Sequence, residues 1–341
     1  MPLTRISLER FTAFEKLDLT LSPGINVFIG ANGTGKTHLM KVMYASCDVS
    51  KTGMNFADKL INVFLPSKKE LGRLVKRKKG SSKCSIRLYR DGGKRLRTIF
   101  SNHATLASSA DVKGVKKWGA KPLEATYIPV KEMLANAPRF RALYSSRDLH
   151  FEEVYADIID RAFRPMLRGP ISEQRRKLLN ILQKEIEGKV SLQEEEFFLR
   201  NKQGNLEFTL LAEGIRKLGL IWLLIQNETL FEGAVLFWDE PETNLNPKLF
   251  RTLIEILLNL QREGVQIFLA THDYVILKEL DLQKKKSDKV KFHSLYHDGE
   301  SKEICCHTAD NYLDIHPNAI AEAFTDLYDR EVKKDLKGLI K

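Results

Sequence analysis

Three short stretches of this sequence carry side chains that could bind a nucleotide and a divalent cation. The first, Gly30-Ala31-Asn32-Gly33-Thr34-Gly35-Lys36-Thr37, fits the spacing G-x-x-x-x-G-K-[ST] of a phosphate-binding P-loop. Main-chain N–H groups of such a loop form a concave anion site, and the following helix adds its positive dipole. Lys36 would neutralise the β- and γ-phosphates, and the Thr37 hydroxyl would ligate Mg²⁺. The candidate phosphate-binding residues are Gly30, Ala31, Asn32, Gly33, Thr34, Gly35, Lys36, Thr37 and His38.

The second stretch places two carboxylates after an apolar run. Asp239 and Glu240 follow Ala234–Trp238, which is the arrangement of a Walker B motif. Asp239 would hold Mg²⁺ through water opposite Thr37, and Glu240 would act as general base for an attacking water. Adjacent carboxylates at a strand end could instead form a turn that caps a helix.

The third stretch is Leu269-Ala270-Thr271-His272-Asp273, at the end of the next apolar run. At a neighbouring strand end, His272 could reach the γ-phosphate and orient water, although a single histidine is more commonly structural. A weaker signal is Glu213-Gly214 at the start of a helix, where free N–H groups could bind a phosphate. Many helices begin with glycine, so this signal is weak when taken alone.

These stretches need a sheet to bring them together. Ile25–Ile29 is a short apolar run typical of a buried strand, and residues 37–44 continue with helical spacing. Because open α/β sheets bind ligands at the C-terminal ends of their strands, we expect the P-loop, Asp239, Glu240 and His272 to meet there. Alternating strands over 3–11 and 15–21 precede the P-loop strand and predict an antiparallel flank. Phe11 or Phe14 could stack on an adenine there, or belong to the core.

The remaining chain predicts a basic insertion over 48–122 and a helical lobe with a hairpin over 150–211. Within the insertion we expect a basic helix over 68–79, a hairpin around Asp91-Gly92-Gly93, and a mobile loop over 101–122. A core strand over 125–129 returns to the sheet. Helices over 151–163 and 172–188 precede a second hairpin, formed by 190–199 and 206–211. We expect one domain over residues 1–341.

Charge is unevenly distributed along the chain. Residues 1–150 hold 28 Lys and Arg against 11 Asp and Glu, whereas the rest holds 27 against 33. Residues 59–97 alone hold 14 basic and 2 acidic side chains. Such a field favours an anionic partner such as nucleic acid. A solvated basic insertion is the alternative, since charge alone does not identify a ligand.

Composition excludes several classes of protein. No window approaches the roughly 18–20 continuous apolar residues of a membrane span, so we expect no membrane partner. The first residues, Met1-Pro2-Leu3-Thr4-Arg5, lack the pattern of a secretion signal. Four cysteines without metal-ligand spacing fit a reducing, cytoplasmic location.

The order of these motifs resembles the ABC-type ATPase heads of the RecF, SMC and OLD class. The similarity rests on "INVFIGANGTGKT" after two strands and on "LFWDEPETNLNP", where Pro and Glu follow the catalytic pair. Bacterial single-domain "AAA family ATPases" related to RecF and OLD show the same layout. The resemblance implies a P-loop α/β fold with an antiparallel flank, a mostly parallel central sheet and a helical lobe. It also implies ATP and Mg²⁺ as ligands.

In that class two heads close face to face over two ATP molecules. The resemblance therefore implies a homodimer or higher oligomer in which Glu213 and Gly214 act on the partner's nucleotide and residues 244–246 line the interface. Related groups work in anti-phage defence beside a separately encoded nuclease or effector. The resemblance thus favours an ATP-hydrolysing switch that regulates a nucleic-acid or effector partner. A RecF-like DNA-repair ATPase and an ATP-dependent scaffold with little hydrolysis are the alternatives.

Several departures from the family pattern bear on these expectations. Ala212 stands where the family has Ser, and a lost hydrogen bond to a charged group is worth about 1.5–3 kcal/mol. No Gln occupies the expected Q-loop position after Pro129, where Lys131 or Glu132 could substitute. No heptad-patterned segment is long enough for a coiled coil, so we do not expect a chromosome-tethering role. No Toprim-type metal cluster follows His272, so nuclease activity would come from a partner.

Overall fold

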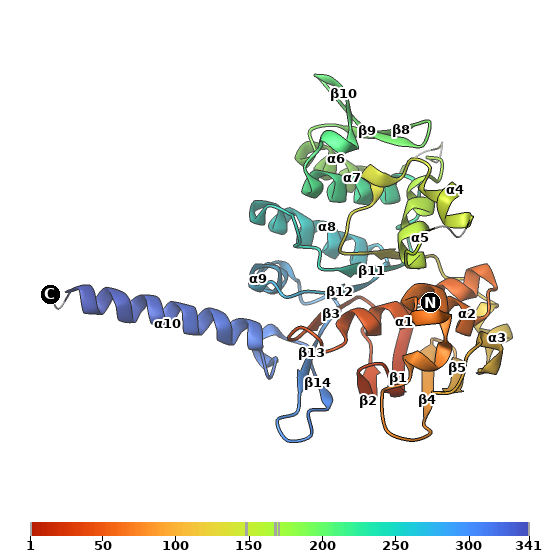
Figure 1. Cartoon of the computed structure of the whole chain (residues 1–341). Coiled ribbons are helices and arrows are strands. Elements are labelled where there is room, and N and C mark those ends of the chain that lie inside the picture. Colours follow the sequence, from red (N-terminus) through yellow and green to blue (C-terminus); the bar gives the residue numbers. More distant parts are fainter. Residues whose placement is uncertain (1, 147–148, 167–168, 170, 340–341) are drawn as a thin grey trace.

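The centre of the computed structural model, which describes residues 2–146, 149–166, 169 and 171–339, is a six-stranded sheet (Figure 1). The strand order is β14-β13-β3-β12-β11-β7. Neighbours from β13 to β7 pair in parallel, and β14 is antiparallel at one edge. The strands are β3 (Ile25–Ile29), β7 (Ala125–Ile128), β11 (Val235–Asp239), β12 (Gln266–Ala270), β13 (Val290–His297) and β14 (Ile304–Ala309). This mostly parallel sheet confirms the predicted α/β class.

Alternating side chains of the central strands enter two separate cores. Val27 and Leu269 belong to one core, together with helices α7 (Glu213–Gln226), α8 (Phe250–Arg262) and α9 (Tyr274–Gln283). Phe28 and Phe268 belong to the other, together with α1 (Lys36–Thr52). Every residue of β3, β11 and β12 is buried, as expected of parallel strands covered on both faces.

A second sheet is antiparallel, with the order β2-β1-β4-β5-β6. Its strands are β1 (Leu3–Phe11), β2 (Phe14–Thr20), β4 (Lys83–Arg90), β5 (Lys94–Ser101) and β6 (Asp111–Lys113). The predicted flank and the predicted hairpin are therefore both present, and β4 pairs directly with β1. The basic segment 48–122 thus contributes three strands to the flank, and its first residues, 48–52, belong to α1.

Two predictions within the segment 48–122 were wrong. Instead of a helix over 68–79 there are two short helical turns, Ser67–Lys69 and Leu71–Leu74, followed by extended chain. Gly72 approaches the loop at Asn102 so closely that a Cβ would lie 2.5 Å from its carbonyl oxygen. Residues 101–122 are ordered by β6 and α3 (Val115–Gly119), and the buried Trp118 donates its Nε1–H to the Ser46 carbonyl. The helix α2 (Phe56–Phe64) precedes these turns.

The lobe after β7 combines helices with a small sheet, drawn in yellow to green in Figure 1. Its helices are α4 (Phe140–Ser145), α5 (Glu153–Ala162) and α6 (Glu173–Glu185), and its strands are β8 (Lys189–Gln193), β9 (Glu196–Asn201) and β10 (Gly204–Glu207). The predicted second hairpin is present as β9 and β10, which turn at residues 202–203. Its first strand was wrong in bounds, because residues 190–199 turn back at Glu194-Glu195 and belong to two strands. That the whole chain forms one domain stays a prediction, and residues 167–168 and 170 of the lobe lie outside the described residues.

Buried charges join α1 to the lobe. The Lys59 ammonium on α2 is 1% exposed and lies 2.8 Å from Asp48 and 2.7 Å from Asp157. Glu153 lies 3.4 Å from the same ammonium, and Arg161 of α5 contacts Asp48 at 2.8 Å. Burial alone would lower the pKa of Lys59, but the surrounding carboxylates raise it. We call these five residues the Lys59 cluster.

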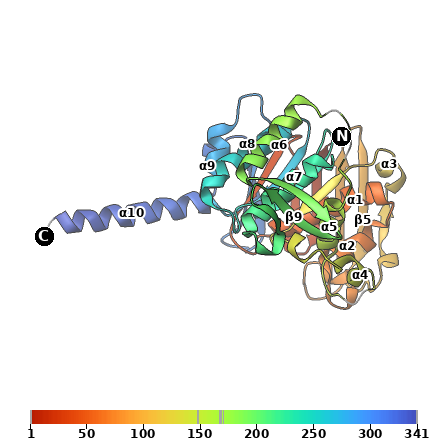
Figure 2. The ribbon, with the colours of Figure 1, turned by 90° about the horizontal axis from the view of Figure 1, so that it is seen from above.

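The helix α10 (Ala319–Leu339) extends from the body of the molecule, as both Figure 1 and Figure 2 show. It is the longest helix among the described residues, and no long coiled coil is present in that part of the chain. None of the helices described is both long and apolar enough to cross a lipid bilayer.

Candidate nucleotide-binding site

The P-loop connects β3 to α1 through backbone that only glycine tolerates at two points. Gly30 has a φ of 143°, and a Cβ there would lie 2.1 Å from the Leu295 carbonyl oxygen. Gly35 has a φ of 84°, and a Cβ there would lie 2.6 Å from the Phe14 ring. Between them, residues 31–33 are exposed to solvent, which leaves their main chain open to a ligand.

Lys36 is the first residue of α1 and is only 6% exposed. Its ammonium donates to the carbonyl oxygens of Gly30 at 2.9 Å and Ala31 at 3.1 Å. Burial lowers the pKa of Lys36 to about 8, although the more distant Asp239 and Glu240 act in the opposite direction. The ammonium therefore lies inside the loop, bonded to main-chain carbonyls.

Asp239 ends β11 and is held by two hydroxyl groups. Thr37 hydrogen-bonds to its carboxylate, and the Tyr127 hydroxyl of β7 donates to Oδ2 at 3.0 Å. Burial raises the pKa of Asp239 above its ordinary value, and the two hydrogen bonds offset only part of that rise. Thr37 and Asp239 thus present a hydroxyl and a carboxylate side by side. These are the hard oxygen donors that Mg²⁺ prefers, so the residues present fit the cation.

Glu240 and His272 follow two adjacent strands, β11 and β12. Their side chains are about one third exposed, and His272 Nε2 lies 3.8 Å from Glu240 Oε1. Glu240 has a φ of 47°, in the left-handed region, and its N–H donates to the Ala270 carbonyl at 2.9 Å. Such backbone strain persists only where neighbours fix it and is common at active sites. Burial and the nearby Lys36 lower the pKa of His272, so its ring is neutral at pH 7.

Tyr127 and Glu242 were missed by sequence reasoning. Glu242 Oε1 accepts hydrogen bonds from the Thr271 hydroxyl at 2.8 Å and from the His272 N–H at 2.9 Å. This carboxylate therefore fixes the backbone that presents His272. Its position in "DEPE" was the available signal, whereas Tyr127 had only a place in a core strand.

Glu213 and Gly214 lie beside the segment that follows Glu240. Asn244 donates to Glu213 Oε2 at 2.9 Å, and the Lys217 ammonium donates to the Thr243 carbonyl. A Cβ on Gly214 would lie 2.9 Å from the Asn244 carbonyl oxygen, and its nearest neighbours are residues 244–245. Thr243 in turn donates its hydroxyl to Glu240 Oε2 at 3.1 Å. The structure thus connects α7 to the catalytic candidate through residues 243–244.

The side chains of four other residues considered from the sequence are buried in contacts within the protein. The His38 ring is largely buried and lies 5.6 Å from the Phe64 ring, so its side chain has a packing role. Phe11 and Phe14 are fully buried, so both belong to the core and neither is available to stack on a base. Glu132 is also buried, 2.7 Å from the Arg216 guanidinium, and β7 is separated from β3 by two strands.

Within the described ranges, no three His, Cys, Asp or Glu side chains are grouped as a metal-ion site. A cation beside Thr37 and Asp239 would therefore take its remaining ligands from phosphate oxygens and water, which is the usual habit of Mg²⁺.

Comparison with known proteins agrees with this geometry. A family model described as "AAA domain, putative AbiEii toxin, Type IV TA system" matches residues 25–278, more than half of the chain. The chain belongs to this AAA-domain family. The match includes the P-loop, Glu213-Gly214, Asp239-Glu240 and His272.

The alignments with curated relatives cover a smaller part of the chain than the family model does. The chain is 31% identical over 97 residues to the DNA replication and repair protein RecF of Clostridium botulinum (strain Eklund 17B), covering 28% of this chain and 27% of RecF. It is 48% identical over 44 residues to RecF of Enterobacter sp. (strain 638), covering 13% and 12%. The chain therefore matches about a quarter or less of the length of these relatives.

The fold of this AAA-domain chain is that of an SMC head. The SMC head of Pyrococcus furiosus bound to the C-terminal domain of ScpA aligns with a TM-score of 0.54 at 11% identity, over 96% of this chain and 99% of that one. An SMC head bound to the C-winged helix domain of ScpA aligns with a TM-score of 0.55 at 11% identity, over 91% and 98%. The predicted resemblance to ABC-type heads of the RecF and SMC class is confirmed, and its link to anti-phage defence stays a prediction.

Basic residues of this AAA-domain chain form two different surfaces. Six of the 14 basic side chains in 59–97 are occupied in ion pairs or buried hydrogen bonds, namely Lys59, Arg73, Lys76, Arg87, Arg90 and Arg97. Among those still exposed are residues 77–79. The basic surface predicted to bind an anionic partner is therefore smaller than the sequence indicates.

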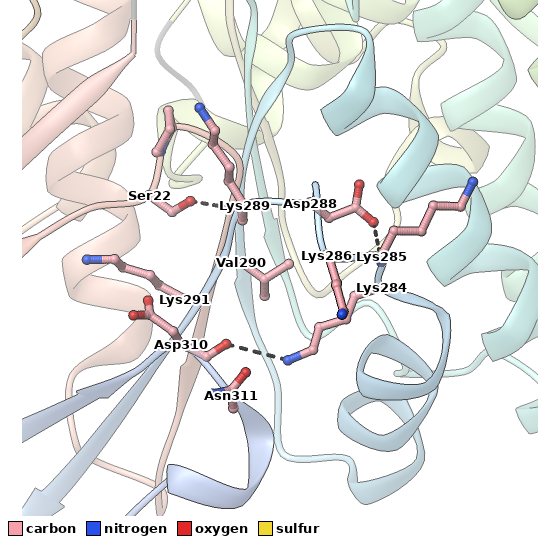
Figure 3. A pocket seen from close by; sticks show the side chains of 11 residues that line it. Ser22, Lys284, Lys285, Lys286, Asp288, Lys289, Val290, Lys291, Asp310 and Asn311 are labelled. Carbon is pink, nitrogen blue, oxygen red and sulfur yellow. Dashed lines mark hydrogen bonds between the residues drawn. The ribbon is translucent and has the colours of Figure 1, made fainter.

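The second basic surface surrounds a pocket of about 510 Å³ that the sequence analysis missed (Figure 3). It lies where β3 and β13 begin, at the end of the sheet opposite to the P-loop. Its lining includes Lys284, Lys285, Lys286, Lys289 and Lys291. Asp288, which also lines it, is held by a bidentate contact with Arg262 at 2.7 and 2.9 Å. In Figure 3 the lysine side chains spread outward around the pocket and do not converge on one point.

Proposed function

We propose that this chain is an ATP-binding and ATP-hydrolysing switch, and that two copies close around two ATP molecules. The observation that carries the proposal is the meeting of Lys36, Thr37, Asp239, Glu240 and His272 at the C-terminal ends of three adjacent strands. Membership of the AAA-domain family and the SMC-head fold support it. In this proposal the site residues keep the roles expected from the sequence.

Residues 30–38 hold the phosphates through main-chain N–H groups, and the Lys36 ammonium moves from the loop carbonyls to the β- and γ-phosphates. Thr37 and Asp239 hold Mg²⁺, which would supply positive charge to the phosphate oxygens. Glu240 accepts a proton from the attacking water, and the neutral His272 orients that water by a hydrogen bond. Glu213 and Gly214 offer the N-terminus of α7 to the nucleotide of the other copy.

The decisive experiment is Glu240→Gln. Removing the general base while keeping the side-chain shape should trap an ATP-bound dimer, which light scattering after gel filtration would detect at saturating ATP. The matched control is Glu263→Gln, an exposed glutamate near the opposite end of β12. A Glu240→Gln protein that stays monomeric with ATP bound would contradict the closure model.

A role in defence, with a separately encoded effector or nuclease, is the finer proposal. The toxin wording in the family's description supports it. A neighbouring gene for a nuclease or toxin, and co-purification of its product with this chain, would support it further. A neighbouring set of recombination genes would favour repair instead.

The second candidate is a nucleic-acid-binding ATPase of the RecF type, favoured by the RecF relatives and the two basic surfaces. Binding to DNA and RNA should weaken with salt, with a slope of about 0.9 per duplex phosphate contacted. Neutralising residues 77–79 in one variant and Lys285, Lys286 and Lys289 in another would identify the surface used. No change in slope in either variant would contradict direct nucleic-acid binding. The third candidate, a scaffold with little hydrolysis, predicts ATP-dependent dimers with negligible phosphate release.

A further inference from the structure

The phenol of Tyr127 reaches the carboxylate of Asp239 from the neighbouring strand of the sheet. β7 lies at the edge of the sheet and pairs in parallel with β11, with Tyr127 opposite Phe237. The Tyr127 hydroxyl donates to Asp239 Oδ2 at 3.0 Å. Tyr127 is 1% exposed and Asp239 is 3% exposed, so this bond forms away from solvent. Hydrogen bonds to an ionised acceptor are stronger than those between neutral groups.

The two hydroxyl groups bonded to Asp239 lie in different surroundings. A carboxylate only accepts hydrogen bonds, so both Thr37 and Tyr127 donate to it. Thr37 belongs to the P-loop and is partly exposed, and the lone pairs of its oxygen can still bind a cation. Tyr127 is buried in the core. A role of Tyr127 in the nucleotide site would therefore be exerted through the carboxylate of Asp239.

Packing fixes the Tyr127 ring in this position. Its centroid lies 6.4 Å from that of Phe237, with an angle of 19° between the ring planes, and 5.5 Å from that of Tyr44 on α1. Phe237 in turn stacks on Phe268, with ring centroids 4.8 Å apart. Close-packed neighbours on these sides restrict the ring. The hydroxyl is therefore held against one oxygen of the carboxylate, which restricts rotation of the Asp239 side chain.

We propose that Tyr127 is a positioning residue for Asp239, the proposed ligand of Mg²⁺. Its hydrogen bond to Oδ2 fixes the carboxylate in the orientation in which Thr37 also binds it. Loss of a partner that orients a metal-binding side chain typically lowers metal affinity by about 10- to 100-fold. This inference rests on the nucleotide site proposed above and does not require two copies to close.

Tyr127→Phe tests this role, because it removes the hydroxyl and keeps the ring. The affinity for a non-hydrolysable ATP analogue, measured by titration calorimetry, should fall about tenfold or more with Mg²⁺ present. With EDTA in place of Mg²⁺, the affinity should equal that of the natural chain. In hydrolysis, the Mg²⁺ concentration for half-maximal phosphate release should rise by a similar factor, whereas the rate at saturating Mg²⁺ should stay within about twofold. Unchanged affinity with Mg²⁺ would overturn the proposal.

Tyr44→Phe is the matched control. Tyr44 is also fully buried, and its hydroxyl donates to the Asp157 carboxylate in the lobe. This variant removes the same kind of hydrogen bond from the same group of aromatic rings and leaves the bond to Asp239 in place. We expect it to lower stability without changing the Mg²⁺ dependence of analogue binding. An equal loss of Mg²⁺-dependent affinity in both tyrosine variants would assign the effect to aromatic packing and would overturn the proposal.

A double variant tests whether the effect passes through the carboxylate. If it does, adding Tyr127→Phe to Asp239→Ala should lower the Mg²⁺-dependent affinity no further than Asp239→Ala alone. A further loss in that background would overturn the positioning role. Denaturant unfolding of each variant without nucleotide verifies that the compared chains are folded.

Lys36→Ala distinguishes this inference from the proposed function. If Lys36→Ala and Asp239→Ala both weaken binding of the analogue with Mg²⁺ and Tyr127→Phe does not, the positioning role fails and the nucleotide site stands. If Lys36→Ala binds the analogue as tightly as the natural chain, the nucleotide site fails and the positioning role fails with it.

Discussion

Lys36, the first residue of α1, and Lys59 of α2 are both almost completely buried, but their ammonium groups have opposite surroundings. Lys36 donates to two main-chain carbonyls, and its pKa falls to about 8. Lys59 is surrounded by three carboxylates, and its pKa is raised. The same side chain at similar depth is thus left without a carboxylate partner in one place and fully paired in the other.

The difference distinguishes a lysine that binds a ligand, Lys36, from a lysine that stabilises the contact between helices, Lys59. A buried charge without a counter-charge is costly, and a protein retains it where a ligand supplies the counter-charge. For a buried charge with several partners, removal of one partner is strongly destabilising, because it leaves an uncompensated charge in the interior. We therefore expect substitutions at Lys59 to affect folding, and substitutions at Lys36 to affect ligand binding.

The largest expected effect is on stability, at Lys59. Lys59→Ala removes the cation shared by Asp48, Glu153 and Asp157 and leaves Asp48 with Arg161 alone, which should lower the free energy of unfolding by about 3–5 kcal/mol. Chemical denaturation would measure it. The exposed Lys69→Ala, as control, should change stability by less than about 0.5 kcal/mol. A Lys59→Ala protein as stable as the control would contradict the structural role assigned to Lys59.

The next effect is on ligand affinity, at Lys36. Lys36→Ala should weaken Mg·ATP binding by about 100-fold or more, since it removes charge-assisted hydrogen bonds to the phosphates. Its unfolding free energy without nucleotide should change far less than that of Lys59→Ala. Titration calorimetry and denaturation on the same preparations would test both statements. Retained ATP affinity would contradict the P-loop assignment.

The pKa of Lys36 predicts a pH dependence of smaller size. ATP binds the charged form, so affinity should fall above pH 8, by up to about tenfold per pH unit. Because the folded-state pKa lies below the ordinary 10.5, the unfolded chain binds more protons between pH 8 and 10.5. The free energy of unfolding of the nucleotide-free chain should therefore rise with pH in that window, relative to Lys36→Ala. Affinity that does not change between pH 7 and 9 would contradict this.

The smallest expected effect concerns Ala212, at the N-cap of α7, where no side chain caps the helix. Ala212→Ser should add about 1 kcal/mol of stability by capping. In the Glu240→Gln background it should also tighten the ATP-dependent dimer by up to about tenfold, because in the proposed closure the hydroxyl would hydrogen-bond to a phosphate of the other copy's nucleotide. Ala212→Gly, which adds no hydroxyl, is the control. An unchanged dimer affinity would show that residue 212 does not contact the nucleotide of the other copy.

The sequence was sufficient for the strands and loops whose signals are local. The P-loop, Asp239, Glu240 and His272 each follow an apolar run of strand length, and that pattern determines the ends of strands in an α/β sheet. Tyr127 could not be predicted, because its contact with Asp239 depends on β7 lying next to β11, 112 residues away in the chain. The Lys59 cluster likewise joins three helices by contacts that no local pattern indicates.

The helix predicted over 68–79 is absent because contacts between distant segments determine the conformation there. Its lysine-rich composition favours helix, but Lys68 and Lys69 adopt left-handed backbone and Gly72 packs against the chain at Asn102. Tertiary contacts therefore outweighed local propensity there.

The hydrogen bond from Thr243 to Glu240 would couple ATP hydrolysis at the two nucleotide sites of a closed pair. The same segment is bonded to α7, whose first turn would meet the nucleotide of the other copy. If α7 engages that nucleotide as proposed, residues 243–244 would transmit the displacement to Glu240, the proposed general base of the same chain. Hydrolysis by a closed pair should then be cooperative, with a Hill coefficient above one for ATP. Thr243→Val should bring that coefficient to one while each site still turns over, and an unchanged coefficient would show that the two sites act independently.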